Sequence, residues 1–134
     1  MKKNGILNGP LSKVVAALGH TDKLVICDSG LPIPRYAEVI DLALTKNIPR
    51  FIETLKIILE ELEVEKAIIA AEIVKKNESV LKEIQSLMNG IKLQKVSHEM
   101  FKEITRQNGR TVFVRTGEAT PYANIILIAG VTFN

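Results

Sequence analysis

The sequence predicts an α/β fold in which layered helices surround one sheet that is mostly parallel or mixed. Short apolar segments typical of buried strands alternate with amphipathic segments of helical period. Some connections between the expected strands are short, which allows a mixed as well as a parallel sheet. No linker, repeat or low-complexity segment divides the 134 residues, so residues 1–134 are expected to form a single domain.

Six apolar or alternating segments are expected to be strands. They cover residues 24–27, 39–44, 67–71, 91–96, 111–115 and 125–131. The last of them is strongly apolar and ends a few residues before Asn134. Exposed at an edge, such a strand would promote aggregation. We therefore expect it to lie in the centre of the sheet or against another subunit, and the latter favours an oligomer.

Four segments are expected to be helices, because polar caps and proline accompany apolar residues at helical spacing. They cover residues 12–18, 49–62, 79–88 and 97–105. Ser12 is the expected N-cap of the first helix. Pro49 fits the first turn of the second. Asn77 or Ser79 is the expected cap of the third, and Ser97 of the fourth.

The composition argues against several classes of function. The formal charge is +3, but lysines and arginines are spread along the chain, without the basic stripe and stacking aromatics of a nucleic-acid interface. The apolar run behind the N-terminal lysines, residues 14–18, is shorter than the roughly 7–15 residues of a signal-peptide core. No run approaches the roughly 18 residues of a membrane span. A single cysteine, Cys27, allows no intramolecular disulfide, and these features together predict a cytoplasmic protein.

The sequence lacks the familiar cofactor and catalytic motifs. It has no Walker A motif, no G-x-G-x-x-G after a strand, no C-x-x-C and no H-E-x-x-H. The segment around Ser29 and Gly30 does not form the nucleophile-elbow motif of hydrolases. Neither a nucleotide cofactor nor a metal ion is therefore expected.

Polar side chains instead occur at the ends of the expected elements. They are His20, Asp28, His98, Lys102, Tyr122 and Asn124. Each also has a purely structural interpretation. His20 could be a solvated residue near a helix end, and Asp28 and Asn124 could organise turns. His98 and Lys102 could lie on a solvent-exposed helix face, and Tyr122 could belong to the core. Glu118 is expected to be a solvated loop residue. Cys27 is expected to be a packed thiol, because an apolar strand lacks the cations that activate one.

Five blocks of sequence carry a specific resemblance. The longest is residues 19–34, Gly-His-Thr-Asp-Lys-Leu-Val-Ile-Cys-Asp-Ser-Gly-Leu-Pro-Ile-Pro. The others are the opening Lys-Asn-Gly-Ile-Leu-Asn, most of residues 97–102, most of residues 115–127 and the closing Ala-Gly-Val-Thr-Phe. Together they resemble the D-ribose pyranase family, relatives of the fucose mutarotases, over essentially the whole chain. Residues 75–95 carry no such signature.

The resemblance implies an activity, a site and an assembly. The activity is the interconversion of the pyranose and furanose forms of D-ribose inside the cell, with no cofactor. His20 is implied as the proton donor. The residues implied to hold the sugar are Asp28, His98, Tyr122, Ala123 and Asn124, with Lys102 nearby. The implied assembly is a homo-oligomer of pentameric rings stacked into a decamer, with sites between adjacent subunits.

The residue types suit this chemistry. Opening a hemiacetal ring removes a proton from the anomeric hydroxyl and delivers one to the ring oxygen, and histidine exchanges protons near neutral pH. A neutral sugar is matched by Asp, Tyr and Asn side chains. If residues 20–28 were extended, His20 and Asp28 would lie roughly 25 Å apart. Either residues 21–23 fold back, or the two side chains come from different chains.

Three alternatives accompany this interpretation. The same acid–base groups would serve a mutarotase for another sugar, such as fucose. The same side chains could also hold a sugar without turnover, in a binding or regulatory module. A metal site built from His20, Asp28 and His98 is disfavoured, because the ligands are far apart in the sequence and no close pair nucleates a site.

Overall fold

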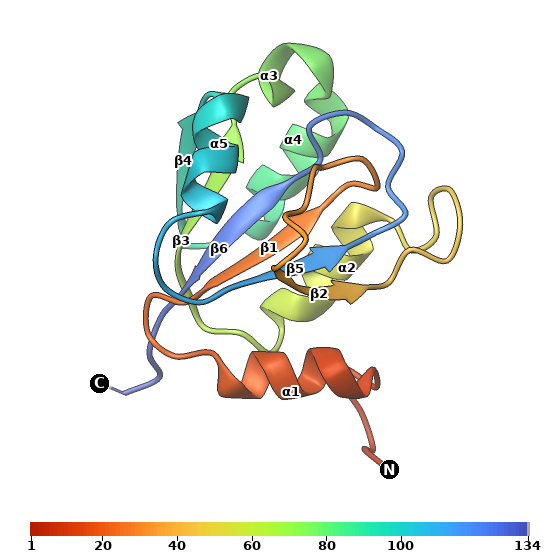
Figure 1. Ribbon diagram of the computed structural model, residues 1–134, viewed down its shortest axis with the longest axis vertical. Coiled ribbons are helices and arrows are strands. Elements are labelled where there is room, and N and C mark those ends of the chain that lie inside the picture. The colour runs from red at the N-terminus through yellow and green to blue at the C-terminus, as the bar shows by residue number, and fades with distance from the viewer. Residues whose placement is uncertain (134) are drawn as a thin grey trace.

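A central six-stranded sheet organises the protein in the computed structural model, which describes residues 1–133 (Figure 1). Its strands are β1 (Lys23–Cys27), β2 (Glu38–Asp41), β3 (Val64–Ala70), β4 (Lys92–Val96), β5 (Thr111–Arg115) and β6 (Ile125–Ala129). The helices are α1 (Gly9–Ala17), α2 (Phe51–Leu59), α3 (Ile73–Lys76), α4 (Glu78–Leu87) and α5 (His98–Thr105). All six expected strands are present, with bounds that differ by a few residues.

The sheet is mixed, in the order β2-β5-β1-β6-β3-β4. β6 runs antiparallel to both of its neighbours, β1 and β3, whereas the other pairs are parallel. The short connection of residues 116–124 before β6 cannot hold a helical crossover, so this strand returns in the opposite direction. The five other strands therefore end at one edge of the sheet, and β6 begins there. The expected α/β fold is confirmed.

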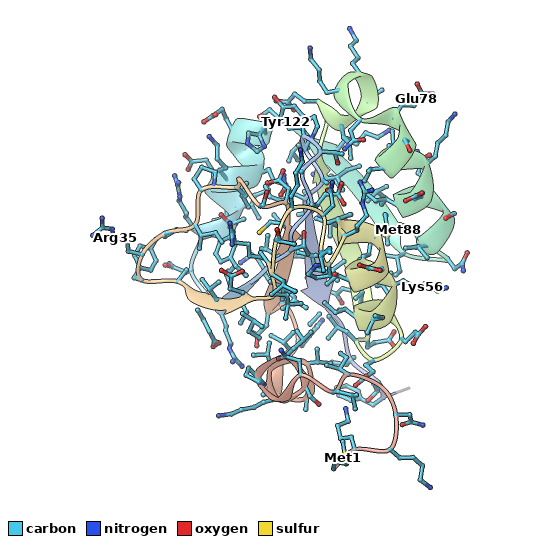
Figure 2. The ribbon with its side chains drawn as sticks, turned by 90° about the vertical axis from the view of Figure 1, so that its right-hand side faces the viewer. Met1, Arg35, Lys56, Glu78, Met88 and Tyr122 are labelled. Carbon is cyan, nitrogen blue, oxygen red and sulfur yellow. The ribbon has the colours of Figure 1, made fainter. Side chains whose placement is uncertain are left out.

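Both faces of the sheet are covered. Alternate side chains of β1 point to the two faces, so that Leu24 and Ile26 join a larger core with α1, α2 and α4, while Val25 and Cys27 join a smaller one with α5. Figure 2 shows α2 and α4 on one side of the sheet and α5 on the other. β6 lies in the middle of the sheet, where residues 125–127 are fully buried. The expected burial of this apolar strand in the sheet is confirmed.

The first helix begins earlier than its sequence pattern indicates. The prediction of Ser12 as its cap is wrong, because the side chain of Asn8 accepts a hydrogen bond from the Leu11 N–H (2.9 Å) and α1 begins at Gly9. Pro10 then occupies the first turn, where its missing N–H is not needed. The second helix, α2, is shorter than expected at both ends.

The later helices follow the expected caps more closely. Ser97 caps α5, and its hydroxyl accepts a hydrogen bond from the Met100 N–H (3.1 Å). Asn77 precedes α4, but its side-chain amide donates to the Thr120 hydroxyl and to the Pro121 carbonyl, both at 2.8 Å. The sequence did not predict the short helix α3. In residues 1–133, none of the helices has the length and apolar character that crossing a membrane requires.

Gly117 lies where two loops approach each other closely. A Cβ at this position would collide with the Thr45 carbonyl oxygen and lie 2.6 Å from the Ile48 carbonyl oxygen. The same loops are hydrogen-bonded, because the Asn47 N–H donates to the Gly117 carbonyl (2.6 Å) and the Gly117 N–H donates to the Pro49 carbonyl (2.9 Å). Only glycine leaves room for this contact between the loop before α2 and the loop before β6.

Replacing Gly117 by alanine is expected to lower the free energy of unfolding by about 1–3 kcal/mol, because the atoms that a Cβ would meet belong to the backbone. Urea unfolding at a fixed protein concentration measures the change. Gly9→Ala is the matched control, because nothing lies within 4 Å of a Cβ there. Equal stability of the two variants would contradict this account of Gly117.

Candidate functional site

Four of the predicted site residues meet at the edge of the sheet where the parallel strands end. Asp28 directly follows β1, and His98 opens α5 just after β4. Tyr122 and Asn124 precede β6, which begins at this edge because it runs in the opposite direction. Together they line a hollow of about 260 Å³ whose other residues are Gly30, Leu31, Pro32 and Pro121. In Figure 2 Tyr122 lies at the top of the molecule, far from the red helix α1.

Asp28 and Asn124 form a closed hydrogen-bonded pair. The Asn124 side-chain oxygen accepts from the Asp28 N–H (2.9 Å), and its amide nitrogen donates to Asp28 Oδ2 (3.2 Å). The other carboxylate oxygen of Asp28 accepts from the Gly30 N–H (2.9 Å). Burial raises the pKa of Asp28 above its ordinary value, although the hydrogen bonds from Gly30 and Asn124 oppose the rise. The carboxyl group is therefore held in one orientation at the wall of the hollow.

His98 and Tyr122 form the aromatic part of the site. Their rings meet edge to face, with centroids 5.1 Å apart and an interplanar angle of 85°. The backbone N–H of His98 donates to the Glu72 carboxylate (3.0 Å), and this hydrogen bond holds the start of α5 in place. Within residues 1–133, His98 Nδ1 is buried without a hydrogen-bond partner. Tyr122 has a φ of 58°, a left-handed backbone that is unfavourable for an aromatic residue and often found at functional sites.

Two other predicted site residues lie close by without lining the hollow. Ala123 is fully buried, and its methyl group packs in the larger core. Lys102 forms an ion pair with Glu99 on the same helix (2.8 Å). For Ala123, the backbone is the part that could meet a ligand.

His20 is placed at the opposite edge of the sheet. It lies in the turn before β1, where it lines a different hollow of about 460 Å³ with Leu18, Glu63 and Gly130 among its neighbours. Its Nε2 lies 2.9 Å from Glu65 Oε2.

The extended strand β1 separates His20 from Asp28 along its whole length. Residues 19–22 form a turn, closed by the hydrogen bond from the Asp22 N–H to the Gly19 carbonyl (3.1 Å). This turn does not bring His20 to the other edge, because β1 runs from Lys23 to Cys27. Within the described chain, no three His, Cys, Asp or Glu side chains converge as a metal site. One subunit therefore cannot assemble His20, Asp28 and His98 around a common ligand.

Glu118 is buried, so the prediction of a solvated loop residue was wrong. Its side chain is 2% exposed, and its carboxylate accepts hydrogen bonds from Arg50 (3.0 Å), the Phe51 N–H (3.0 Å) and the Thr120 hydroxyl (2.6 Å). Burial acts to raise the pKa of Glu118, but the hydrogen bonds from Arg50, Thr120 and Phe51 outweigh it, and the pKa is lowered. The only sequence signal for this role was its place in the block of residues 115–127.

Glu118 also joins the two loops that build the hollow. Its backbone carbonyl accepts from the Ser29 N–H (2.9 Å) and the Ser29 hydroxyl (3.0 Å), next to Asp28. Its carboxylate holds Thr120, two residues before Tyr122. The loop after β1 and the loop before β6 are therefore fixed to each other.

Cys27 ends β1 just before Asp28. It is fully buried, and burial, followed by the charge of Asp28, raises the pKa of its thiol to about 12. A thiol held in its neutral form is a poor nucleophile. The expectation of a packed thiol is confirmed.

Comparison with known proteins identifies the family. The sequence model of the RbsD / FucU transport protein family matches residues 1–132. The chain is 51% identical to the D-ribose pyranase of Coprothermobacter proteolyticus over 133 residues, which cover 99% of this chain and 100% of that protein. It is also 51% identical to the D-ribose pyranase of Geobacillus thermodenitrificans, with 100% of both chains covered.

A solved structure agrees with these relatives. Bacillus subtilis RbsD complexed with D-ribose matches with 48% sequence identity and a TM-score of 0.93, over 99% of this chain and 100% of that one. The chain belongs to the RbsD / FucU family. The resemblance inferred from the sequence blocks is thereby confirmed.

Replacing Glu118 by glutamine is expected to lower the free energy of unfolding at pH 7 by about 1–3 kcal/mol, because a buried charged acceptor loses its charge-assisted bonds. A lowered pKa stabilises the folded state above the ordinary glutamate pKa of about 4.3, and this contribution is lost as the pH falls through the folded value. The difference between wild type and variant should therefore shrink below about pH 4. Urea unfolding at several pH values measures it. Glu83→Gln is the control. It removes an exposed charge near the start of α2 and should change the free energy of unfolding little.

Proposed function

We propose that this protein is an isomerase that interconverts the pyranose and furanose forms of free D-ribose without a cofactor. The observation that carries the proposal is the full-length match to RbsD complexed with D-ribose, at 48% identity and a TM-score of 0.93. The name D-ribose pyranase of the two relatives supports the same activity. The hollow at the edge where the parallel strands end is lined by carboxylate, imidazole, phenol and amide groups. These groups suit the hydroxyls of a neutral sugar.

The proposed reaction has two halves, ring opening and ring closure; each half moves two protons, and together they exchange one C–O bond. A proton leaves the anomeric hydroxyl, its oxygen becomes the aldehyde oxygen as the bond from C1 to the ring oxygen breaks, and the ring oxygen takes up a proton. Reclosure reverses these steps through a different hydroxyl, which loses its proton as its oxygen bonds to C1. Substrate and product have the same atoms and oxidation state, so the step needs no oxidant, phosphate donor or covalent nucleophile. General acid–base help of about 10²- to 10⁴-fold is what positioned side chains supply.

The side chains divide into two groups in this proposal. His20 delivers and removes protons. Asp28, His98 and Tyr122 hold the sugar hydroxyls, together with the backbone of Ala123. Asn124 holds the Asp28 carboxylate and forms part of the wall, and Lys102 stands outside the hollow beside His98.

The active site is proposed to form between adjacent subunits, because one subunit carries His20 and Asp28 at opposite edges of its sheet. The extended strand β1 between them spans roughly 13 Å at about 3.3 Å per residue, too far for one sugar to reach both side chains. A homo-oligomer brings the His20 edge of one subunit to the Asp28 edge of the next. Exposed apolar side chains that assembly could cover include Tyr36, Leu44 and Phe133. Pentameric rings stacked into a decamer are the proposed form.

The proposed setting is the cytoplasm, and the proposed partners are the sugar and other copies of this chain. The one cysteine is buried as a free thiol, which suits a reducing compartment. The lysines and arginines form ion pairs with glutamate and aspartate at several places on the surface, such as Arg110 with Glu38 and Arg115 with Asp41. Such paired charges do not favour a nucleic acid as partner.

Wild-type protein is expected to accelerate exchange between the pyranose and furanose signals of D-ribose in NMR saturation-transfer spectra. His20→Ala should lose about 10²- to 10⁴-fold of that rate, because it removes the proton carrier. The variant should still bind ribose in a titration, since the groups that hold the sugar are intact. Acceleration with L-fucose anomers but not with ribose would turn the assignment to a fucose mutarotase. Binding without any acceleration would turn it to a sugar-binding module.

Mixing two inactive variants tests the shared site. His20→Ala and Asp28→Asn subunits, dissociated and reassembled together, should regain part of the exchange rate, because about a quarter of the interfaces then carry both intact residues if assembly is random. Each variant reassembled alone is the control. A mixture as inactive as its components would show that both residues must come from one subunit.

A further inference from the structure

The proposed proton carrier has a carboxylate partner at the far edge of the sheet. His20 Nε2 lies 2.9 Å from Glu65 Oε2, and the two side chains are 53% and 45% exposed. None of the residues around the other hollow, which is lined by Asp28, His98 and Tyr122, takes part in this contact. A pair this exposed adds little to the stability of the fold, so its effect must be sought in the chemistry of the imidazole.

A local irregularity of the sheet directs Glu65 towards His20. The register between β3 and β6 shifts between Val64 and Lys66, which places Glu65 at a β-bulge. Bulges turn a side chain away from the regular alternation of a strand and are common beside active sites. Gly130 lies beside this bulge, since a Cβ there would come within van der Waals contact (3.4 Å) of the Glu65 Cβ.

The turn that carries His20 is held to the same end of β6. The Thr21 N–H donates to the Ala129 carbonyl (2.9 Å), and the Ala129 N–H donates to the Asp22 carbonyl (2.9 Å). The Gly19 N–H donates to the Asp22 carboxylate (2.8 Å), which closes the turn. His20 before β1 and Glu65 on β3 therefore face each other across the end of β6, each on backbone that is hydrogen-bonded in place.

We propose that Glu65 is a positioning residue that fixes the tautomer of His20, so that Nδ1 is the atom that exchanges protons with the sugar. An ionised carboxylate only accepts hydrogen bonds, so Nε2 must carry the hydrogen of this contact. In the neutral ring the lone pair is then on Nδ1. When Nδ1 takes a proton from the sugar, the Glu65 charge stabilises the imidazolium that forms, and the proton returns to the sugar from the same nitrogen. This inference rests on the proposed function of His20.

Steady-state exchange kinetics separate positioning from binding. Glu65→Ala is expected to lower kcat about tenfold, less than His20→Ala does, because the imidazole is still present but no longer held. The KM for ribose should stay unchanged, because the groups that hold the sugar lie at the other edge of the sheet. Glu65→Gln should restore part of kcat, since its amide oxygen accepts the same hydrogen bond without the charge. Glu60→Gln is the control, because it removes an exposed glutamate charge that does not line the His20 hollow and should leave kcat at the wild-type value.

Nitrogen-15 NMR of the imidazole rings tests the tautomer directly. The chain has two histidines, so the His20 signals are those that disappear in His20→Ala. The neutral ring should show a protonated Nε2 and an unprotonated Nδ1 in wild type, with more protonated Nδ1 in Glu65→Ala. A protonated Nδ1 in the neutral wild-type ring would overturn the inference.

The kinetic outcomes also separate this inference from the function on which it rests. If His20→Ala keeps full activity, the proposed role of His20 fails. If His20→Ala is inactive and Glu65→Ala is as active as wild type, the role of His20 stands and that of Glu65 fails. A raised KM with unchanged kcat in Glu65→Ala would place Glu65 in sugar binding and would equally overturn the inference.

Discussion

The direction of β6 decides where each proposed site residue lies. Because β6 runs antiparallel between β1 and β3, its start brings Asn124 to the edge where β1 ends at Asp28. Its other end lies between the turn that carries His20 and the bulge that carries Glu65. One buried apolar strand thus organises two polar clusters at opposite edges of the sheet. If β6 were parallel to its neighbours, the residues before it would lie at the His20 edge. The hollow beside Asp28 and His98 would then lose the wall that Tyr122 and Asn124 form.

The two clusters are held by different means, which suit their different tasks. The hollow at the carboxyl edge is built from two loops that are joined through buried groups, chiefly the Glu118 carboxylate and the Asn124 amide. Buried hydrogen bonds of this kind are costly to break, so they hold the groups proposed to face the sugar in one arrangement. The His20 edge is open to solvent and fixed mainly through backbone hydrogen bonds. An exposed edge is free to meet a neighbouring subunit, and a site divided in this way would make catalysis depend on assembly.

Local sequence predicted the elements well and their partners poorly. The alternating and apolar runs identified all six strands, because a strand in a covered sheet needs apolar side chains whatever its neighbours are. The first helix start was misplaced because Asn8 and Ser12 are both good caps, and the choice depended on Pro10 fitting the first turn. Glu118 was misjudged because its partners, Arg50 and Phe51, lie 68 and 67 residues away in the sequence. No local pattern reports such a contact.

The sequence by itself determined the fold class, the strands, the packed state of Cys27 and the family, because these follow from side-chain periodicity and from long specific blocks such as residues 19–34. The tertiary structure decided which of the polar residues meet. Asp28, His98, Tyr122 and Asn124 converge because strand direction brings distant loops to one edge. His20 is kept away from them by the length of β1 and meets Glu65 across β6 instead. Strand order and direction depend on contacts between residues far apart in the chain, and these arise only when the whole sheet has formed.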